Sequence, residues 1–294
     1  MADTFSGVFT AMVTPMTADQ QLDLDALAKL TEHLIGHGIH GLCPLGSTGE
    51  YYALSDEERL QVIETVIKTA DGRVPVVPGT NSGGTQQIVE YSKQAEQAGA
   101  AGVLLAAPYY SLPTDDELFE HFRAISDGIG IPIMLYNYPG RTGVDMDPAL
   151  VARMADIENV KYIKESSGDI PRVSEIIDLC GDRMTVFCGC DTGALESFVS
   201  GAVGWVSGAP NFLPAEHVKM FELSVVQRDF EAARQHGATF LPILRLLESG
   251  KYTQLVKHGC GLKGYPVGPT RQPLLPVSAE EGAVLKELVD GLGG

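Results

Sequence analysis

The sequence has few cysteines, and no spacing among them suggests a metal site. Five cysteines in 294 residues are an odd number, which argues against a disulfide scaffold and for reduced thiols. Cys188 and Cys190 are separated by one residue, an unusual spacing for zinc, and the helical pair His33 and His37 has no complement. We therefore expect no metal. The five cysteines are Cys43, Cys180, Cys188, Cys190 and Cys260.

Basic residues and long apolar runs are also scarce. The chain has 21 Lys and Arg against 38 Asp and Glu, a net charge of −17, which argues against nucleic acid as a partner. A cation inside a pocket could still hold an anionic substrate, because its field is local. No window approaches the ~18 apolar residues that would span a bilayer, and residues 1–4 lack the basic start of a signal peptide. These features predict a soluble, cytoplasmic protein without membrane contact.

Short apolar, β-prone runs alternate with longer amphipathic segments over the first 210 residues. Eight such units predict a (β/α)8 TIM barrel, because parallel neighbours need a crossover and a closed ring leaves no edge strand. An open doubly wound sheet is the alternative. The predicted strands are 8–13, 41–45, 74–78, 103–107, 131–136, 160–164, 184–188 and 202–206. The predicted helices lie near 24–35, 55–67, 85–98, 115–127, 147–155, 170–180 and 192–200.

The strand signal ends near residue 210, and the remaining chain is helical in pattern. Apolar residues recur at helical spacing in the segments 218–225, 240–247, 252–258 and 279–292. No Ser-, Gly- or Pro-rich linker separates them from the barrel. We expect residues 1–210 to form the barrel with the active site and residues 211–294 to form helices packed on it, within one structural domain.

Polar groups follow several predicted strands at the end where a barrel places its chemistry. Lys164 ends strand 160–164, and an amine partly desolvated by its apolar neighbours could attack a ketone to form a Schiff base. Tyr136 ends another strand and is a phenol suited to proton relay. Ser47 and Thr48 lie between glycines, where hydroxyls and amides could hold a small carboxylate. Arg141 could bind a second carboxylate through its guanidinium. Each residue alone is also compatible with a surface or packing role.

In this order and spacing, the motifs resemble those of the dihydrodipicolinate synthase and N-acetylneuraminate lyase family, pyruvate-dependent class I lyases and aldolases on a (β/α)8 barrel. The resemblance covers essentially the whole chain. It depends on Thr14-Pro15, the run G-S-T-G-E at 46–50, Pro108-Tyr109-Tyr110, Tyr136-Asn137 with Pro139, I-K-E-S-S-G-D at 163–169, and residues 204–207.

The resemblance implies roles for individual residues. Lys164 matches the lysine that forms the imine with a 2-oxo acid, and Tyr136 matches a proton-shuttling tyrosine. Ser47 and Thr48 match the positions that hold the pyruvate carboxylate, with Ser47 also relaying protons. The resemblance also implies that Arg141 receives the carboxylate of aspartate semialdehyde and that Val206 lines the site. Tyr110 is expected to reach into a neighbouring subunit of a homotetramer built as a dimer of dimers. No metal or organic cofactor is expected.

The resemblance leaves the second substrate and the physiological direction open. Condensation of pyruvate with aspartate semialdehyde is the best single expectation. The alternatives are an N-acetylneuraminate lyase, a 2-keto-3-deoxy sugar acid aldolase or dehydratase, a 4-hydroxy-2-oxoglutarate aldolase, or a non-enzymatic protein that binds a 2-oxo acid. Ser47 stands where synthases usually carry Thr. Feedback inhibition by lysine is expected to be absent, because the residues at the positions of that site differ: Tyr51, Tyr52, Asp56, Arg59, Gly83 and Gln87.

Overall fold

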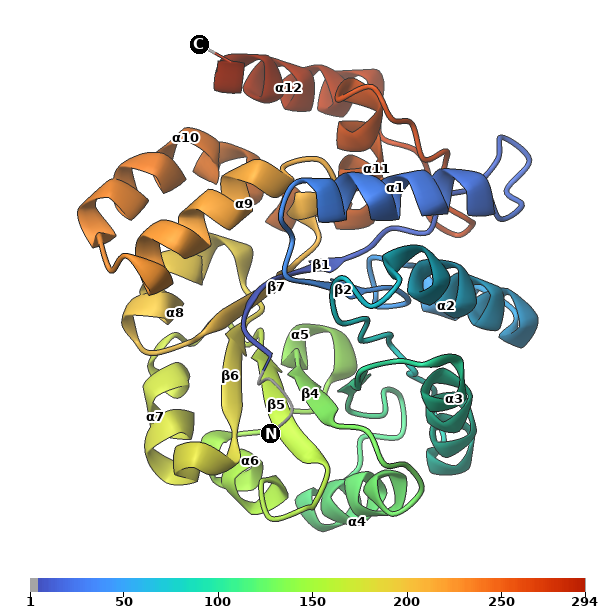
Figure 1. Cartoon of the computed structure of the whole chain (residues 1–294), viewed down its shortest axis with the longest axis vertical. Helices are drawn as coiled ribbons and strands as arrows, with labels where there is room; N and C mark the ends of the chain where they lie inside the picture. Colours follow the sequence, from blue (N-terminus) through green and yellow to red (C-terminus); the bar gives the residue numbers. More distant parts are fainter. Residues whose placement is uncertain (1–4, 294) are drawn as a thin grey trace.

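A ring of parallel β-structure forms the centre of the molecule, with helices outside it (Figure 1). The structure is a computed structural model that describes residues 5–293; residues 1–4, where no signal peptide is expected, and residue 294 lie outside the described part. Neighbouring strands pair in the order β2-β1-β7-β6-β5-β4-β3. The strands are β1 (Gly7–Ala11), β2 (Gly41–Cys43), β3 (Val103–Ala106), β4 (Ile133–Asn137), β5 (Val160–Glu165), β6 (Thr185–Cys188) and β7 (Gly204–Ser207).

The prediction of a third strand at residues 74–78 is wrong, because this segment is not a regular strand. The segment nevertheless closes the ring between β2 and β3. It makes only isolated parallel bridges, Leu42 with Val76 and Gly79 with Leu104. Val77 donates its N–H to Leu42 O at 2.8 Å, and Pro78 O accepts from Leu104 N at 2.9 Å. Proline has no N–H to donate, so prolines at 75 and 78 interrupt the hydrogen-bond ladder. The TIM barrel prediction is confirmed: seven regular strands and this one irregular segment, which lies between β2 and β3, together form the ring.

Side chains alternate between the interior of the ring and the layer under the helices, as the two-residue period of a strand requires. The interior cluster includes Phe9, Met134, Tyr162, Phe187 and Val206. Their immediate neighbours along the strands, such as Val8, Leu135 and Ile163, join the larger core against the helices. On β5 this alternation turns residues 162 and 164 inward, and it thereby determines where Lys164 points.

The helices cover the outside of the ring, and their starts are specified locally. Ser55 accepts from the Glu58 amide while the Glu58 carboxylate accepts from the Ser55 amide, a capping box that begins α2. Thr114 and Glu117 form the same arrangement at α4. The helices are α1 (Leu24–Gly36), α2 (Asp56–Ala70), α3 (Thr85–Ala98), α4 (Asp115–Ser126), the short α5 (Pro139–Thr142), α6 (Pro148–Met154), α7 (Pro171–Cys180) and α8 (Ala194–Val199).

Four further helices follow β7 and lie on one side of the ring, towards the top of Figure 1. They are α9 (Pro214–Phe221), α10 (Phe230–Glu248), α11 (Tyr252–Leu262) and α12 (Ala279–Asp290). His217 of α9 lies between the rings of Trp205 and Phe240, at centroid distances of 4.3 and 5.3 Å. Such contacts bring the end of α10 and the start of α11 to the carboxyl ends of the strands, so the C-terminal helices form part of the wall of the central cavity.

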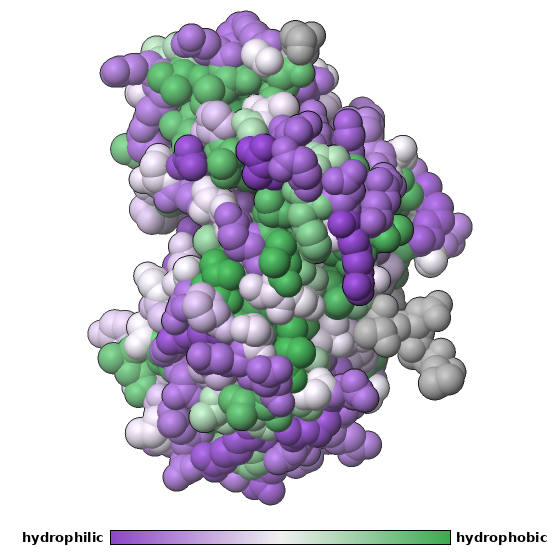
Figure 2. All heavy atoms as spheres, turned by 90° about the vertical axis from the view of Figure 1, so that its left-hand side faces the viewer, coloured by the Kyte–Doolittle hydropathy of each residue, from purple (hydrophilic) through white to green (hydrophobic). Residues whose placement is uncertain are grey.

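The surface is mostly polar, with separate apolar groups. Figure 2 shows the side of α7 to α10, on which apolar residues are interspersed among polar ones. Four exposed apolar side chains come from elements on this side: Leu179, Val199, Val226 and Phe230. Within residues 5–293, every helix is too short or too polar to span a bilayer.

Candidate active site

Lys164 lies at the carboxyl end of β5 with its side chain in a cavity of about 440 Å³. Only 6% of its surface is exposed. Its register partners are Tyr136 on β4 and Phe187 on β6. A buried lysine at a strand end is costly unless its amine has a function or a partner. Within residues 5–293 this amine forms no ion pair.

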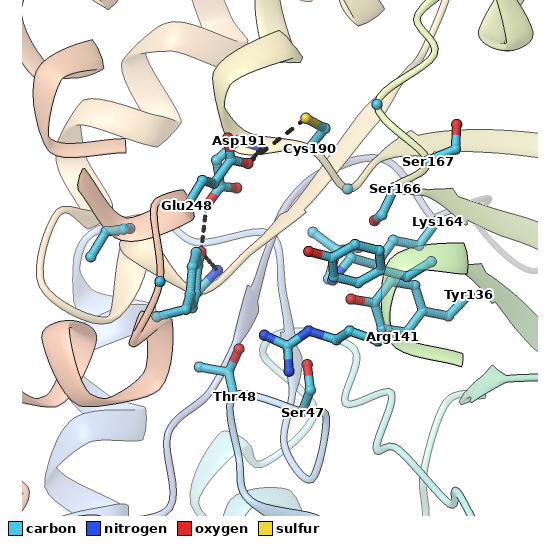
Figure 3. Close-up of a pocket in the computed structure, with 18 of the residues that line it drawn as sticks. Ser47, Thr48, Tyr136, Arg141, Lys164, Ser166, Ser167, Cys190, Asp191 and Glu248 are labelled. Carbon is cyan, nitrogen blue, oxygen red and sulfur yellow. Dashed lines mark hydrogen bonds between the residues drawn. The ribbon is translucent and has the colours of Figure 1, made fainter. Parts of the chain in front are cut away.

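Tyr136 lies directly beside the lysine. The Lys164 Nζ is 4.2 Å from the centroid of the Tyr136 ring, and 8% of the tyrosine is exposed. Figure 3 shows the two side chains extending into the same cavity. The parallel register sets this contact, because both residues occupy inward positions at the same height on adjacent strands. A phenol at this position can exchange protons with groups on the carbon attached to the lysine nitrogen.

Ser47 and Thr48 form a turn after β2 that faces the same cavity (Figure 3). The turn is closed by hydrogen bonds from Gly49 N to Gly46 O at 3.0 Å and from Glu50 N to Ser47 O at 3.2 Å. Val206 on β7 is fully buried and also lines the cavity. Hydroxyls grouped in this way can donate to a small carboxylate. The structure thus brings five predicted residues together: Lys164, Tyr136, Ser47, Thr48 and Val206.

Arg141 lies at the rim of the cavity, whereas Tyr110 is not among the residues that line it. Arg141 lines the cavity mouth, with its guanidinium carbon 5.5 Å from the centroid of the Tyr138 ring. Tyr110 lies outside this cavity: 96% of its surface is exposed, and its φ of 73° is in the left-handed region, which is unusual for a non-glycine residue. The structure therefore places Arg141 with the other predicted residues and leaves Tyr110 pointing to solvent.

The ends of β4 and β5 are held together by a buried polar network behind the lysine. The Asn137 side chain donates to Glu165 at 3.0 Å and accepts from Met146 N at 3.0 Å. Glu165 in turn accepts from Ser167 N at 2.6 Å. Asn137 and Glu165 are almost fully buried and have several partners, which fixes the backbone on both sides of Lys164.

Ser166 and Gly189 contribute to the site although no role was predicted for them. Ser166 continues the inward alternation of Lys164, is 7% exposed, and its hydroxyl has no hydrogen-bond partner within the described residues. Gly189 packs on the lysine stem: a Cβ there would lie 1.9 Å from Ser166 Oγ and 2.7 Å from Lys164 Cγ. The period of two along β5 and β6 was the signal that could have identified both residues.

The far wall of the cavity combines a buried acid with residues of the C-terminal helices. Asp191 accepts from Trp205 Nε1 at 3.1 Å and from the Tyr252 hydroxyl, and Gly208 N donates to that hydroxyl at 3.0 Å. Burial raises the pKa of Asp191 to about 6. Glu248 accepts from Asp191 N at 2.7 Å. Nothing in the sequence pattern indicated that residues 248 and 252 would reach this cavity.

No cluster that could hold a metal ion appears among residues 5–293. The five cysteines are unpaired, and burial raises the pKa of the Cys188 thiol to about 12. The described residues that line the cavity offer an amine, a phenol, hydroxyls, a guanidinium and two carboxyl groups.

Fold and site together define a class: (β/α)8-barrel proteins whose cavity at the carboxyl ends of the strands contains a buried lysine beside a tyrosine. Within that class, the chain belongs to the Dihydrodipicolinate synthetase family, whose profile matches residues 4–291. This result confirms the family resemblance predicted from the motifs, and proteins of this family are lyases.

Several relatives resemble the chain over nearly its full length. It is 38% identical over 277 residues to the 4-hydroxy-tetrahydrodipicolinate synthase of Oceanobacillus iheyensis, covering 94% of each chain. It is 39% identical to 4-hydroxy-tetrahydrodipicolinate synthase 1 of Halalkalibacterium halodurans, covering 93% of this chain and 92% of the relative. Among solved structures, the dihydrodipicolinate synthase of Acinetobacter baumannii in complex with pyruvate has a TM-score of 0.95 at 33% identity, covering 99% of each chain.

Proposed function

We propose that this protein is a 4-hydroxy-tetrahydrodipicolinate synthase that condenses pyruvate with aspartate semialdehyde through a Schiff base on Lys164. The observation that carries the proposal is the buried Lys164 amine, 4.2 Å from the Tyr136 ring centroid in a cavity with a hydroxyl-rich turn. Relatives that are 36–39% identical over most of the chain, and that bear the name of this synthase, support the assignment of the reaction.

In the proposed reaction, the neutral amine of Lys164 attacks the ketone carbon of pyruvate. Water leaves, with the Tyr136 phenol donating and accepting the protons, and a protonated imine forms. The imine withdraws electrons, so the methyl group of pyruvate loses a proton to give an enamine. The enamine carbon then attacks the aldehyde carbon, and a proton is delivered to the new alkoxide. The amino group of the former semialdehyde next attacks the imine carbon and displaces the Lys164 nitrogen, which closes the ring of the product and restores the free lysine amine. Ser47 and Thr48 hold the pyruvate carboxylate, and Arg141 binds the distal carboxylate of the aldehyde.

Borohydride reduction in the presence of pyruvate tests the covalent step. Reduction of an imine fixes the adduct, and we expect intact mass and peptide mapping to locate it on Lys164. Lys164→Ala should abolish both the adduct and turnover. Lys161 is the matched control, because it lies on the same strand but is exposed; Lys161→Ala should retain both. An adduct on another residue, or undiminished turnover in Lys164→Ala, would contradict the proposal.

A second candidate is the cleavage of a hydroxylated 2-oxo acid such as a 2-keto-3-deoxy sugar acid. One observation favours it: the unpartnered hydroxyl of Ser166 next to Lys164, which could bind a substrate hydroxyl. A turnover panel separates the two reactions. Product from pyruvate and aspartate semialdehyde supports the synthase, whereas release of pyruvate from a sugar acid, with no condensation, supports the lyase.

We also propose that the protein assembles as a homotetramer, a dimer of dimers. Exposed apolar groups on two separate surfaces support this. One surface is the loop with Tyr109, Tyr110 and Leu112, where Tyr110 could enter the site of a neighbouring subunit. The other is the side of α7 to α10 shown in Figure 2. Sedimentation should give a tetramer, and Tyr110→Arg should yield smaller species with lower turnover. A monomer with full activity would contradict this assembly.

A further inference from the structure

One ion pair in the described part of the chain is almost completely buried. Lys257 Nζ on α11 lies 2.6 Å from Glu50 Oε1, and their side chains are 3% and 0% exposed. In every other ion pair within residues 5–293 both side chains are at least 15% exposed. Burying two charges is costly even when they are paired, so such a pair is weak evidence for stability and suggests another role.

Glu50 directly follows the turn that contains Ser47 and Thr48. Its amide closes that turn by donating to Ser47 O at 3.2 Å. Its φ of 56° lies in the left-handed region, which a non-glycine residue adopts only where its surroundings hold it. The Thr14 hydroxyl donates to Gly49 O at 2.6 Å from the other side. Glu50 is therefore part of the end of the turn, and its buried side chain anchors that end.

Further contacts tie Glu50 and Lys257 to the segment between α11 and α12. Glu50 Oε2 accepts from Arg271 N at 2.8 Å, and Lys257 Nζ donates to Pro269 O at 2.8 Å. This segment also packs tightly on the loop after β1, because a Cβ at Gly268 would lie 1.7 Å from Met16 O. The two buried charges thus join the turn to a segment more than 200 residues away in sequence.

The Arg271 side chain extends the connection to the helix that follows the turn. Its guanidinium donates to Gln20 O at 3.0 and 2.9 Å and to Ala53 O at 2.9 Å. It also forms an ion pair with Glu58 at 2.5 Å. Glu58 belongs to the capping box that begins α2, so Arg271 connects the part of the loop nearest α2 to the C-terminal segment.

We propose that Glu50, Lys257 and Arg271 are positioning residues that hold the Ser47–Thr48 turn at the right place relative to Lys164 for the carboxylate of the 2-oxo acid. None of the three lines the cavity. The inference rests on the proposed function, because it assumes a 2-oxo acid bound covalently to Lys164 and through its carboxylate to the turn. It assigns the C-terminal helices a role in substrate binding as well as in packing.

The test compares two ketones of similar size in the borohydride trapping experiment. Pyruvate has a carboxylate and hydroxyacetone has none, so only pyruvate presents a charged group to the turn. Lys257→Met removes the buried cation. Arg271→Lys removes the guanidinium and with it several of the hydrogen bonds to Gln20, Ala53 and Glu58. Arg234→Lys is the matched control, because Arg234 forms an exposed ion pair with Glu231 on α10. The measured quantity is the concentration of each ketone that gives half-maximal labelling of Lys164.

We expect both variants to need roughly 10-fold more pyruvate, since misplacement by about 1 Å can cost 10²-fold. The value for hydroxyacetone should change less than about twofold, and the control should match the wild type. A purely structural defect would shift both ketones equally and would overturn the inference, as would unchanged pyruvate values. If Lys257→Met does not fold, Arg271→Lys decides alone. If the wild type itself is not labelled on Lys164, the proposed function fails and the inference falls with it.

Discussion

Gly189→Ala is expected to disable the site with little effect on the fold. Gly189 does not have a positive φ, so alanine is acceptable to the backbone, and any penalty arises from contacts. The added Cβ would lie 1.9 Å from Ser166 Oγ, and 2.7 and 2.8 Å from Lys164 Cγ and Cε. The backbone cannot retreat freely, because Gly189 N donates to Glu165 O at 2.7 Å.

The size of the effect follows from these distances. To restore a contact of 3.4 Å, the Ser166 oxygen must move about 1.5 Å and the lysine carbons about 0.6–0.7 Å. The serine can rotate, since its hydroxyl has no partner, whereas the lysine stem must shift bodily. Misplacing a reacting group by about 1 Å costs up to 10²-fold in rate. Overpacking costs about 1–3 kcal/mol of stability.

Steady-state turnover and thermal unfolding of the same preparations measure the two effects. Gly36→Ala is the control, because Gly36 ends α1 with no other atom within 4 Å of a Cβ. It should keep wild-type kcat/KM, while Gly189→Ala should lose roughly 10-fold to 10²-fold in kcat/KM yet remain folded. Wild-type kcat/KM in Gly189→Ala would refute the packing of Gly189 against the lysine stem.

Three further predictions concern the second substrate, acid stability and regulation. Arg141→Gln should raise KM for aspartate semialdehyde about 10-fold or more, because a charged hydrogen bond is lost, with KM for pyruvate unchanged; equal changes in both would count against this role. Burial lowers the pKa of His217 to about 3, so stability is lost as pH falls below about 6.5, by roughly 3 kcal/mol at pH 4.5. His217→Phe should remove that loss in urea unfolding at pH 7.5 and 4.5, and an unchanged pH dependence would contradict it. Millimolar L-lysine should leave the rate unchanged, since Arg59 is engaged by the Tyr91 ring at 4.0 Å and by Asn81 O at 2.9 Å; inhibition would overturn this prediction.

The barrel and the floor of its cavity could be predicted because local patterns determine them. The alternation along β5 turns Lys164 inward, and the register of β4 places Tyr136 beside it. The same alternation, continued two residues beyond Lys164 and Phe187, would have identified Ser166 and Gly189 as residues that face the cavity. The prolines at 75 and 78 were visible in the sequence, and their missing N–H groups explain why that segment is not a regular strand.

Contacts between distant segments were not predictable in this way. Tyr252 and Glu248 come from the C-terminal helices, and their approach to Asp191 depends on how α10 and α11 pack on the ring. The pairing of Glu50 with Lys257 joins residues 207 positions apart. Helical periodicity indicates which face of a helix is buried, but it does not specify against which strand end that face packs.

A crystal structure of the protein soaked with pyruvate tests most directly whether Lys164 forms a covalent imine with a 2-oxo acid. We expect continuous electron density from Lys164 Nζ to the ketone carbon of pyruvate, with the carboxylate within hydrogen-bond distance of Ser47 and Thr48. Pyruvate bound without a covalent link to Lys164, or bound outside this cavity, would contradict the imine mechanism.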